Sequence, residues 1–290
     1  MIWYRPMPMD TAAATTFDAL IATSGLPRVE ARALLEHATR QSREFLVAHG
    51  TEPCPPAAAA RFRRLVADRS AGRPLAYLVG EREFRGRRFG IDRHVLIPRP
   101  ETEGLVVEAL ASIAAIADPA VLDLGTGSGI IAICIALARP DAAIVATDRS
   151  ARALARARRN ADEHGVRIAF RQGDWWQALA GRPPKPFDAG FDLVVSNPPY
   201  IAAADRHLVE GDLRFEPRAA LSPGPSGTEA IERIAAGAPG RLRRGGWLAL
   251  EHGHDQAGAV VAILASAGFE AVVTRQDLAG LDRVTVGRLA

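Results

Sequence analysis

The segment Asn197-Pro198-Pro199-Tyr200 directly follows an apolar run at 191–196 and has the residue types needed to hold a flat, weakly nucleophilic nitrogen. Prolines fix φ and lack an N–H, so the segment stays rigid while its carbonyl oxygens remain free to accept hydrogen bonds. The Asn197 side-chain oxygen and the Pro198 carbonyl can each accept one N–H of an NH2 group, while the Tyr200 ring lies against the planar group. The motif therefore indicates an amino or amide methyltransferase, although a proline-rich turn that closes a buried strand explains it equally well. The candidate catalytic residues are Asn197, Pro198 and Tyr200, and the candidate acceptor-binding residues are these three with Pro199.

A second motif, Asp-Leu-Gly-Thr-Gly-Ser-Gly at 123–129, lies where an expected strand passes into an expected helix. Glycines there let the backbone turn tightly and approach a ligand closely, which indicates a nucleotide-like cofactor, although dinucleotide-binding loops look similar. The Asp123 carboxylate would repel a pyrophosphate and attract an ammonium or sulfonium group. S-adenosyl-L-methionine carries both cations. The residues of the loop that we expect to bind this cofactor are Gly125, Thr126, Gly127, Ser128 and Gly129.

Further polar residues follow the next expected strands. Asp148 lies at about the twenty-residue spacing at which an acidic side chain binds ribose hydroxyls, and this role is favoured over that of a helix cap. In Asp174-Trp175-Trp176 an acid and an aromatic ring can meet the adenine amino group and face, although a packed aromatic pair is nearly as good an interpretation. We therefore expect Trp175 to bind the cofactor as well. Asn197 follows the fourth strand and faces the same crevice, where the cofactor and the acceptor nitrogen would meet.

The elements that must position these residues alternate between strand and helix after residue 100, which predicts a doubly wound, Rossmann-like sheet in an α/β fold. The last two of seven strands have no helix between them, so we expect an antiparallel hairpin at the edge, as in class I methyltransferases. Residues 10–71 show only helical periodicity and predict a small N-terminal helical domain, and residues 77–97 predict a β-hairpin linker. The expected strands are 121–124, 143–147, 166–170, 193–196, 247–251, 270–274 and 283–289. The expected helices of the sheet domain are 101–117, 130–138, 152–163, 229–236 and 256–267.

The composition narrows the class of protein. The 290 residues are 48% hydrophobic, enough for one large or two smaller globular domains. The net charge of +3 is carried almost wholly by arginine, since Lys185 is the only lysine, and this indicates a compositional bias more than a nucleic-acid partner. Cys54 and Cys134 form no disulfide framework or zinc pattern, so we expect no metal site and a reducing, cytoplasmic location. No export signal or bilayer-spanning run is evident, so we expect no membrane association.

These motifs together resemble the HemK/PrmC family, the peptide chain release factor N5-glutamine methyltransferases. The resemblance extends over nearly the whole chain. Two segments are specific to the family: Pro-Leu-Ala-Tyr-Leu-Val-Gly at 74–80 with Glu83-Phe84, and Leu-Ile-Pro-Arg-Pro-Glu-Thr-Glu at 96–103. The glycine loop and Asn-Pro-Pro-Tyr at 197–200 also occur in other methyltransferases. The chain departs from the family's pattern at 222–228 and at Leu281, which puts local loop details in doubt.

The resemblance implies transfer of a methyl group from S-adenosyl-L-methionine to the side-chain amide nitrogen (N5) of the glutamine in the GGQ motif of peptide chain release factors, which are the implied protein partners. It implies cofactor-binding roles for the glycine loop, Asp148, Trp175 and Asn197, and glutamine binding by residues 197–200. Residues 1–73 would form a helical domain that helps to bind the release factor, residues 74–98 the hairpin linker, and residues 99–290 the methyltransferase domain.

Other functions remain open at this point. A ribosomal-protein glutamine N5-methyltransferase is the close alternative, disfavoured by Pro-Arg-Pro-Glu-Thr-Glu. An adenine-N6 nucleic-acid methyltransferase applies the same acceptor edge to a flipped base, but the N-terminal domain has few of the aromatic residues that such an enzyme needs, and we expect no stable nucleic-acid binding. A non-catalytic adaptor with a nucleotide-like pocket is a further alternative, and Asp123 disfavours a dehydrogenase.

No general base is evident in the sequence. His252 and His254 follow the fifth expected strand, where packing or capping is the favoured interpretation. Arg99, Glu101 and Glu103 either order the linker over the cofactor or are ordinary charges at a helix start.

Overall fold

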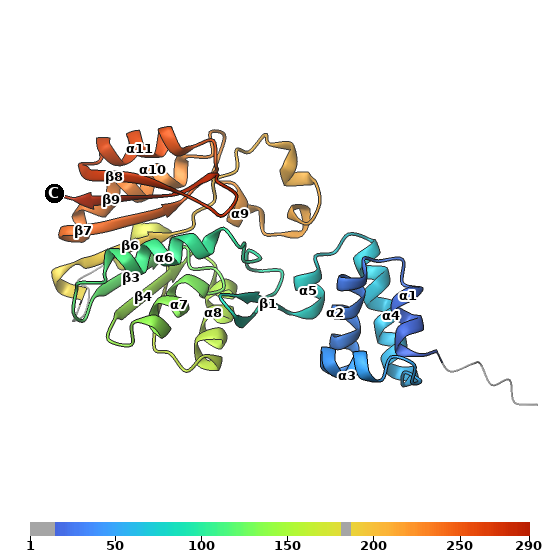
Figure 1. Cartoon of the computed structure of the whole chain (residues 1–290). Coiled ribbons are helices and arrows are strands. Elements are labelled where there is room, and N and C mark those ends of the chain that lie inside the picture. Colours follow the sequence, from blue (N-terminus) through green and yellow to red (C-terminus); the bar gives the residue numbers. More distant parts are fainter. Residues whose placement is uncertain (1–14, 181–186) are drawn as a thin grey trace, which may run out of the picture. The chain divides into compact units, whose positions relative to one another are not determined.

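The computed structural model describes residues 15–180 and 187–290, so residues 10–14 of the expected helical stretch lie outside it. The contacts within the chain divide it into two compact units, Met1–Val79 and Gly80–Ala290 (Figure 1). Each unit has its own hydrophobic core.

The first unit is helical, as its periodicity predicts. Leu34, Leu35 and Phe62 are almost completely buried at its centre. The starts of two helices are set by hydroxyl caps, in which Thr16 Oγ1 accepts from Ala19 N and Ser42 Oγ accepts from Phe45 N. Its helices are α1 (Phe17–Ala22), α2 (Arg28–Thr39), α3 (Arg43–Ala48), α4 (Pro56–Ser70) and α5 (Leu75–Val79).

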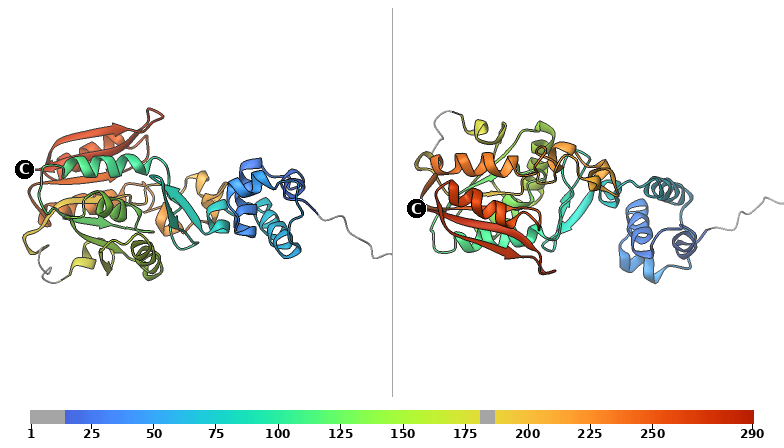
Figure 2. Two further views of the ribbon diagram at one scale, coloured as in Figure 1. Left: turned by 60° about the horizontal axis from the view of Figure 1, so that its bottom comes forward. Right: turned by 90° about the horizontal axis from the view of Figure 1, so that it is seen from above.

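The second unit begins with a short antiparallel hairpin and continues with a sheet of seven strands (Figures 1 and 2). The hairpin strands are β1 (Glu81–Phe84) and β2 (Arg87–Gly90). The strands of the large sheet are β3 (Ala120–Leu124), β4 (Ala143–Asp148), β5 (Ala169–Gln172), β6 (Phe191–Ser196), β7 (Leu242–Glu251), β8 (Phe269–Gln276) and β9 (Asp282–Leu289).

The order of the seven strands is β5-β4-β3-β6-β7-β9-β8. The first five in this order are parallel, and β9 is antiparallel to both β7 and β8. The order reverses between β3 and β6, and in such sheets ligands bind outside the carboxyl ends of the strands at this switch point. The fold class predicted from the sequence, including the antiparallel edge, is confirmed.

Helices cover both faces of the sheet (Figure 2). Helices α10 and α11 pack on the face formed by Leu122, Leu124, Val194 and Leu248, whereas α6 and α7 pack together on the other. The strands in the middle of the sheet are mostly apolar because both faces are buried. The helices of this unit are α6 (Thr102–Ser112), α7 (Ile130–Ala138), α8 (Ala151–Glu163), α9 (Arg218–Leu221), α10 (Glu229–Gly237) and α11 (Ala257–Ser266). Short 3₁₀ turns lie at Trp175–Leu179, Phe187–Ala189, Arg206–Val209, Leu213–Phe215 and Ala238–Gly240.

The hairpin β1–β2 is fixed to the sheet unit through α8. Phe84 and Phe89 are buried and lie edge to face, with ring centroids 6.4 Å apart. The buried Asn160 side chain accepts from Gly90 N and donates to Gly90 O and Ser128 O, at 2.8–3.1 Å. One amide therefore joins the hairpin to the glycine loop.

Several element boundaries differ from the sequence-based expectation. Helix α5 was not expected, and β5 begins at Ala169 rather than 166 because Val166 N closes the turn after α8 by donating to Ala161 O. Strand β7 begins at Leu242, five residues earlier than predicted, since its glycine-containing first half pairs with β6 only after a register shift.

Cys54 and Cys134 are buried free thiols. Within residues 15–180 and 187–290, no helix has the length and apolar character to cross a membrane.

Candidate active site

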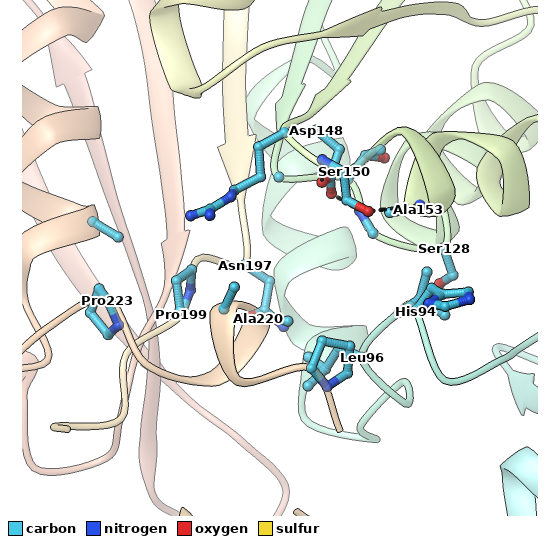
Figure 3. Close-up of a pocket in the computed structure, with 18 of the residues that line it drawn as sticks. His94, Leu96, Ser128, Asp148, Ser150, Ala153, Asn197, Pro199, Ala220 and Pro223 are labelled. Carbon is cyan, nitrogen blue, oxygen red and sulfur yellow. Dashed lines mark hydrogen bonds between the residues drawn. The ribbon is translucent and has the colours of Figure 1, made fainter. Parts of the chain in front are cut away.

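A cavity of about 440 Å³ lies at the carboxyl ends of β3, β4 and β6. Figure 3 shows walls from several parts of the second unit: Ser128, Asp148 and Ser150 on one side, Asn197 and Pro199 on another, and His94 and Leu96 from the end of the linker. The remaining wall includes Ala220 and Pro223, which precede α10.

The glycine loop bends around this cavity with three residues in the left-handed region. Gly125, Gly127 and Gly129 have φ of +71°, +57° and +85°, which other residues rarely adopt. A Cβ on Gly129 would also lie 3.1 Å from Ala157 Cβ, so this glycine lets α7 approach α8. At Gly127 a Cβ would meet open space. Of the loop residues that line the cavity, Gly125 and Gly127 present only backbone to it.

Asp148 braces this loop and faces the cavity. Its Oδ2 accepts from Gly127 N at 2.9 Å and its Oδ1 accepts from Ser150 N at 2.8 Å. The cap of α8 is Ser150, whose hydroxyl accepts from Ala153 N, so the helix-cap interpretation of Asp148 is wrong. Burial raises the pKa of Asp148, and the two backbone N–H groups act in the opposite direction. Each carboxylate oxygen keeps a lone pair for a ligand hydroxyl.

Asp123 does not have the position that the sequence argument gave it. Its side chain is fully buried below the loop and is not among the residues that line the cavity. Its Oδ2 accepts from Thr126 Oγ1 at 2.6 Å, and burial raises its pKa to about 7. Asp123 supports the loop from beneath, so direct contact with a cationic ligand was a wrong expectation.

The two adjacent tryptophans lie in different surroundings. Trp175 lines the cavity with Asp174, has φ of +46°, and lies 3.4 Å from where a Cβ on Gly125 would be. Trp176 instead donates through Nε1 to Arg233 O at 2.9 Å and lies against Gly237 of α10. The interpretation as a packed aromatic pair therefore fits Trp176, whereas Trp175 faces the ligand space.

A second cavity of about 240 Å³ adjoins the first, and Asn197 and Pro199 line both. Pro198 and Tyr200 line the second cavity but not the first. All four residues predicted to bind the acceptor thus meet at one place. The other residues around this cavity are Leu96, Arg99, Glu101, Ile201, Leu213, Ala220, Leu221 and Arg283.

The side chains of this loop are held from distant parts of the chain. Asn197 Nδ2 donates to Thr102 Oγ1 at 3.1 Å, at the start of α6. The Tyr200 hydroxyl donates to Glu251 Oε1 at 3.2 Å, at the end of β7. Burial and the neighbouring Glu251 raise the pKa of Tyr200, so its phenol stays protonated. The Tyr200 carbonyl accepts from Gln256 Nε2 at 3.0 Å.

The charged residues of the linker's end have partners in the structure. Arg99 forms an ion pair with Glu216, and the other carboxylate oxygen of Glu216 accepts from Ile97 N at 2.9 Å. Glu103 accepts from Arg85 N at 3.1 Å and holds the hairpin turn, whereas Glu101 lines the second cavity. Arg99 and Glu103 therefore order this segment, as one of the two interpretations expected.

His252 is buried and is not among the residues lining either cavity. Its Nε2 lies 2.8 Å from Thr285 Oγ1 and its Nδ1 lies 2.8 Å from Gly253 O. Burial lowers its pKa. These contacts support the packing interpretation over a catalytic one.

Sequence reasoning missed several residues of the site. Thr102, Ser222 and Glu251 were not candidates, and neither was the linker's end at 93–98 as a cavity wall. A signal was present at Thr102, the only hydroxyl within Pro-Arg-Pro-Glu-Thr-Glu, but its partner is 95 positions away. The divergent segment 222–228 also contributes Ser222 to the first cavity.

Buried polar atoms without hydrogen-bond partners indicate which ligand groups the site can bind. Across the described residues, such side-chain atoms are Arg32 Nε, Asp123 Oδ1, Asn197 Oδ1, Ser222 Oγ and Glu251 Oε2. Four of these five belong to the site or lie beneath it. An unpaired buried acceptor costs stability, so its retention indicates a ligand donor. Of these atoms only Asn197 Oδ1 and Ser222 Oγ belong to residues that line the first cavity, and together with the Asp148 carboxylate and the Trp175 ring they fit a nucleoside with an amino-acid tail.

No group of three or more His, Cys, Asp or Glu residues that could hold a metal ion occurs in the described ranges, 15–180 and 187–290.

Comparison with known proteins gives consistent matches over both units. Residues 12–80 match the PrmC N-terminal domain and residues 103–224 match the Methyltransferase small domain. The "Release factor glutamine methyltransferase" of Bordetella pertussis is 52% identical and covers 95% of this chain and 100% of its own. The proteins of the same name from Xylella fastidiosa (Temecula1) and Neisseria gonorrhoeae are 51% and 47% identical, covering 92% and 94% of this chain and 95% and 97% of theirs.

Among solved structures, the catalytic domain of hMettl16 aligns with a TM-score of 0.53 at 16% identity, over 70% of this chain and 75% of that one, and supports the fold alone.

The seven-stranded sheet with its antiparallel edge and the cofactor cavity at the switch point define an S-adenosylmethionine-dependent methyltransferase of class I. At about half identity over more than nine-tenths of its length, the chain belongs to the release factor glutamine methyltransferase family.

Proposed function

We propose that this protein transfers a methyl group from S-adenosyl-L-methionine to the side-chain amide nitrogen of the glutamine in the GGQ motif of peptide chain release factors. The observation that carries the proposal is Asn197. Its Oδ1 is buried and unpaired at the junction of two cavities, while its Nδ2 is fixed to Thr102. The relatives named as release factor glutamine methyltransferases support the choice of acceptor.

The larger cavity would hold the cofactor. Asp148 would accept the ribose hydroxyls, the Trp175 ring would lie against the adenine, and backbone groups of the glycine loop would approach the ligand closely. When bound, the cofactor supplies an electrophilic methyl group on a sulfonium. Asn197 and Pro199, which line both cavities, would define the place where the methyl donor and acceptor meet.

The smaller cavity would hold the glutamine side chain. An amide nitrogen is a poor nucleophile because its lone pair is delocalised into the carbonyl, so alignment must supply most of the catalysis, at best about 7–11 kcal/mol. Asn197 Oδ1 and the Pro198 carbonyl would each accept one amide N–H, which fixes the amide plane. Acceptors aimed at the N–H groups also favour the positive charge that develops on this nitrogen.

Labelling tests the proposal directly. The protein is incubated with methyl-labelled cofactor and a release factor that carries either Gln or Ala in its GGQ motif, and the labelled peptide is located by mass spectrometry. We expect label only on the Gln form, at the side-chain amide. Equal labelling of both forms overturns the proposal. Label on a ribosomal protein or on adenine N6 of a nucleic acid, with none on the release factor, would support the alternative acceptors.

We also propose that the helical unit binds the body of the release factor. Val29 and Val47 of this unit are large apolar side chains that are 81% and 63% exposed. Changing both to Asp should raise the KM for the release factor several-fold and leave the Kd for S-adenosylmethionine unchanged. The matched control is Val107→Asp, a 51% exposed valine on α6 of the other unit, for which we expect neither change. An unchanged KM in the double variant would exclude this role for the two valines.

We propose a cytoplasmic location. The two cysteines are free thiols, which fits a reducing compartment, and the proposed substrate acts in translation. Fractionation of cells that express a tagged form provides the measurement.

A further inference from the structure

The mechanism above leaves one buried ionisable group unused. Glu251 is the last residue of β7, and its side chain is completely buried. Its neighbour Leu250 pairs in register with Ser196, the residue before Asn197. Glu251 therefore lies at the carboxyl end of the strands, beside the start of the acceptor loop. A carboxyl group without exposure is costly to bury, and burial raises its pKa to about 7.

The contacts of Glu251 connect it to the acceptor loop. Its Oε1 accepts the Tyr200 hydroxyl at 3.2 Å, whereas no donor meets hydrogen-bond geometry at its Oε2, although the Thr102 hydroxyl lies near enough to lower the pKa of the carboxyl group. A group that served stability alone would have both oxygens paired or would be apolar, because replacing a poorly satisfied buried charge by an apolar side chain is often neutral or stabilising. The retained carboxyl therefore indicates a task in the site.

The neighbours of Glu251 come from several elements of the second unit. Tyr200 comes from the loop after β6, Thr102 and Glu101 from the start of α6, and Arg283 from β9. The hydroxyls of Thr102 and Tyr200 and the charge of Arg283 lower the pKa of Glu251, whereas burial and Glu101 raise it. Thr102 also accepts from Asn197 Nδ2, so Glu251 lies beside the hydrogen bonds made by the side chains of Asn197 and Tyr200.

We propose that Glu251 is a positioning residue, which fixes the Tyr200 ring against the acceptor cavity by accepting its hydroxyl and so sets the orientation of the bound amide. The proposal rests on the proposed function, because it assumes that the cavity lined by residues 197–200 takes the acceptor. Glu251 acts through Tyr200 and does not itself touch the substrate. The free energy lost by removing its acceptor oxygen should therefore appear in kcat rather than in cofactor binding.

Two substitutions separate the hydrogen bond from the volume of the side chain. Glu251→Leu removes the acceptor and also the unpaired buried carboxyl, so we expect an unchanged or raised melting temperature together with a kcat lowered roughly 10–100-fold, the range for a hydrogen bond to a charged group. Glu251→Gln keeps an acceptor oxygen and should recover part of the loss. The Kd for S-adenosylmethionine should stay within about threefold in both.

A double-mutant cycle tests whether the effect passes through the tyrosine. Tyr200→Phe removes the hydroxyl alone and should lower kcat by a factor similar to that of Glu251→Leu, and the double variant should be no slower than the slower single one. The matched control is Asp192→Asn, a buried carboxylate at the opposite end of β6 that accepts from Ala120 N at 2.7 Å and from Arg243 at 2.6 Å. It should lower the melting temperature and leave kcat unchanged.

The outcomes separate this proposal from the proposed function. Ring NMR signals of labelled tyrosine can be followed in the protein without any acceptor, since the chain has only three tyrosines. The Tyr200 signal should shift in Glu251→Leu. An unshifted signal, or an unchanged kcat while the wild type is active, or fully additive losses in the cycle, overturns the proposal. A wild type that labels no release factor overturns the proposed function instead, and the Tyr200 signal then decides the case of Glu251 alone.

Discussion

The two sides of the site are built in different ways. The cofactor side, formed by residues 125–129, Asp148 and Trp175, is held mainly by backbone groups, as in the bond from Gly127 N to Asp148 across 21 positions. The acceptor side, formed by residues 197–200 with Thr102 and Glu251, is held by bonds between side chains. Its two main bonds span 95 and 51 positions.

This difference teaches where specificity for the acceptor comes from. A backbone-built loop needs only its glycines and one carboxylate, so many methyltransferases can share it. A loop positioned by side chains from α6 and β7 depends on how these elements pack beside it. Glu251 lines neither cavity, so it can be changed without altering the wall of the cofactor cavity. We therefore expect substitutions on the two sides to separate kcat from cofactor affinity.

The largest expected effect is on the acceptor side, from Asn197→Ala. This change removes the unpaired Oδ1 and the bond to Thr102, and we expect kcat to fall on the order of 10²-fold, the scale of one preorganised hydrogen-bonding group. Steady-state methylation at saturating cofactor gives the value. Thr102→Val, which keeps Asn197 but removes its partner, should lie between the wild type and Asn197→Ala. A kcat within threefold of wild type for Asn197→Ala would break the comparison.

On the cofactor side, Asp148→Ala should mainly weaken binding. Loss of two hydrogen bonds to a charged group, together with the brace on Gly127, should raise the Kd for S-adenosylmethionine about 10–100-fold by calorimetry. At saturating cofactor kcat should remain within a few-fold of wild type. The control is Asp141→Ala, just before the opposite end of the same strand, where the carboxylate pairs with Arg139 and should not affect the Kd. A selective fall in kcat would reverse the assignment.

The same contrast explains what the sequence predicts well. The strands, the helices that follow them and the glycine loop depend on local periodicity and on backbone conformations that only glycine adopts readily. Most of their ends were predicted to within three residues, whereas the start of β7 and the end of α6 were each five residues off. Asp148 was proposed because it ends the next strand at about the twenty-residue spacing from the glycine loop, and it does contact Gly127 of that loop. The antiparallel edge followed from the lack of a helix between β8 and β9.

The errors and omissions share a different cause. Glu251 ends an apolar strand, and nothing in its neighbours shows that Tyr200 lies 3.2 Å away. Asp123 precedes the glycines and was expected to face the cofactor, but side chains alternate along a strand, and its own faces the buried side, where Thr126 binds it. The roles of Glu251 and Asp123 both depend on tertiary packing rather than on the spacing of residues in the sequence.

A smaller effect separates the two adjacent tryptophans on the cofactor side. Trp175→Ala removes a ring that lines the cavity, and the Kd for S-adenosylmethionine should rise roughly 10-fold, as for loss of one aromatic contact. Trp176→Ala loses the bond to Arg233 O and the contact with α10, so it should lower the melting temperature by a few degrees with little change in Kd. The comparison fails if both variants weaken cofactor binding equally.

The last expected effect is on folding stability alone and concerns the backbone of the cofactor side itself. Gly129→Ala and Gly268→Ala both place a Cβ at positive φ, +85° and +89°, which costs about 1–2 kcal/mol. At Gly268 the Cβ meets open space, whereas at Gly129 it lies 3.1 Å from Ala157 Cβ and 3.2 Å from Ile133 Cδ1. Crowding should therefore make Gly129→Ala less stable by about a further 1–3 kcal/mol. Urea unfolding followed by tryptophan fluorescence measures this, since three of the four tryptophans lie in the second unit. If both variants lost the same free energy of unfolding, the glycine loop would have moved to accommodate the new methyl group. The cofactor side would then not be the more rigid of the two sides.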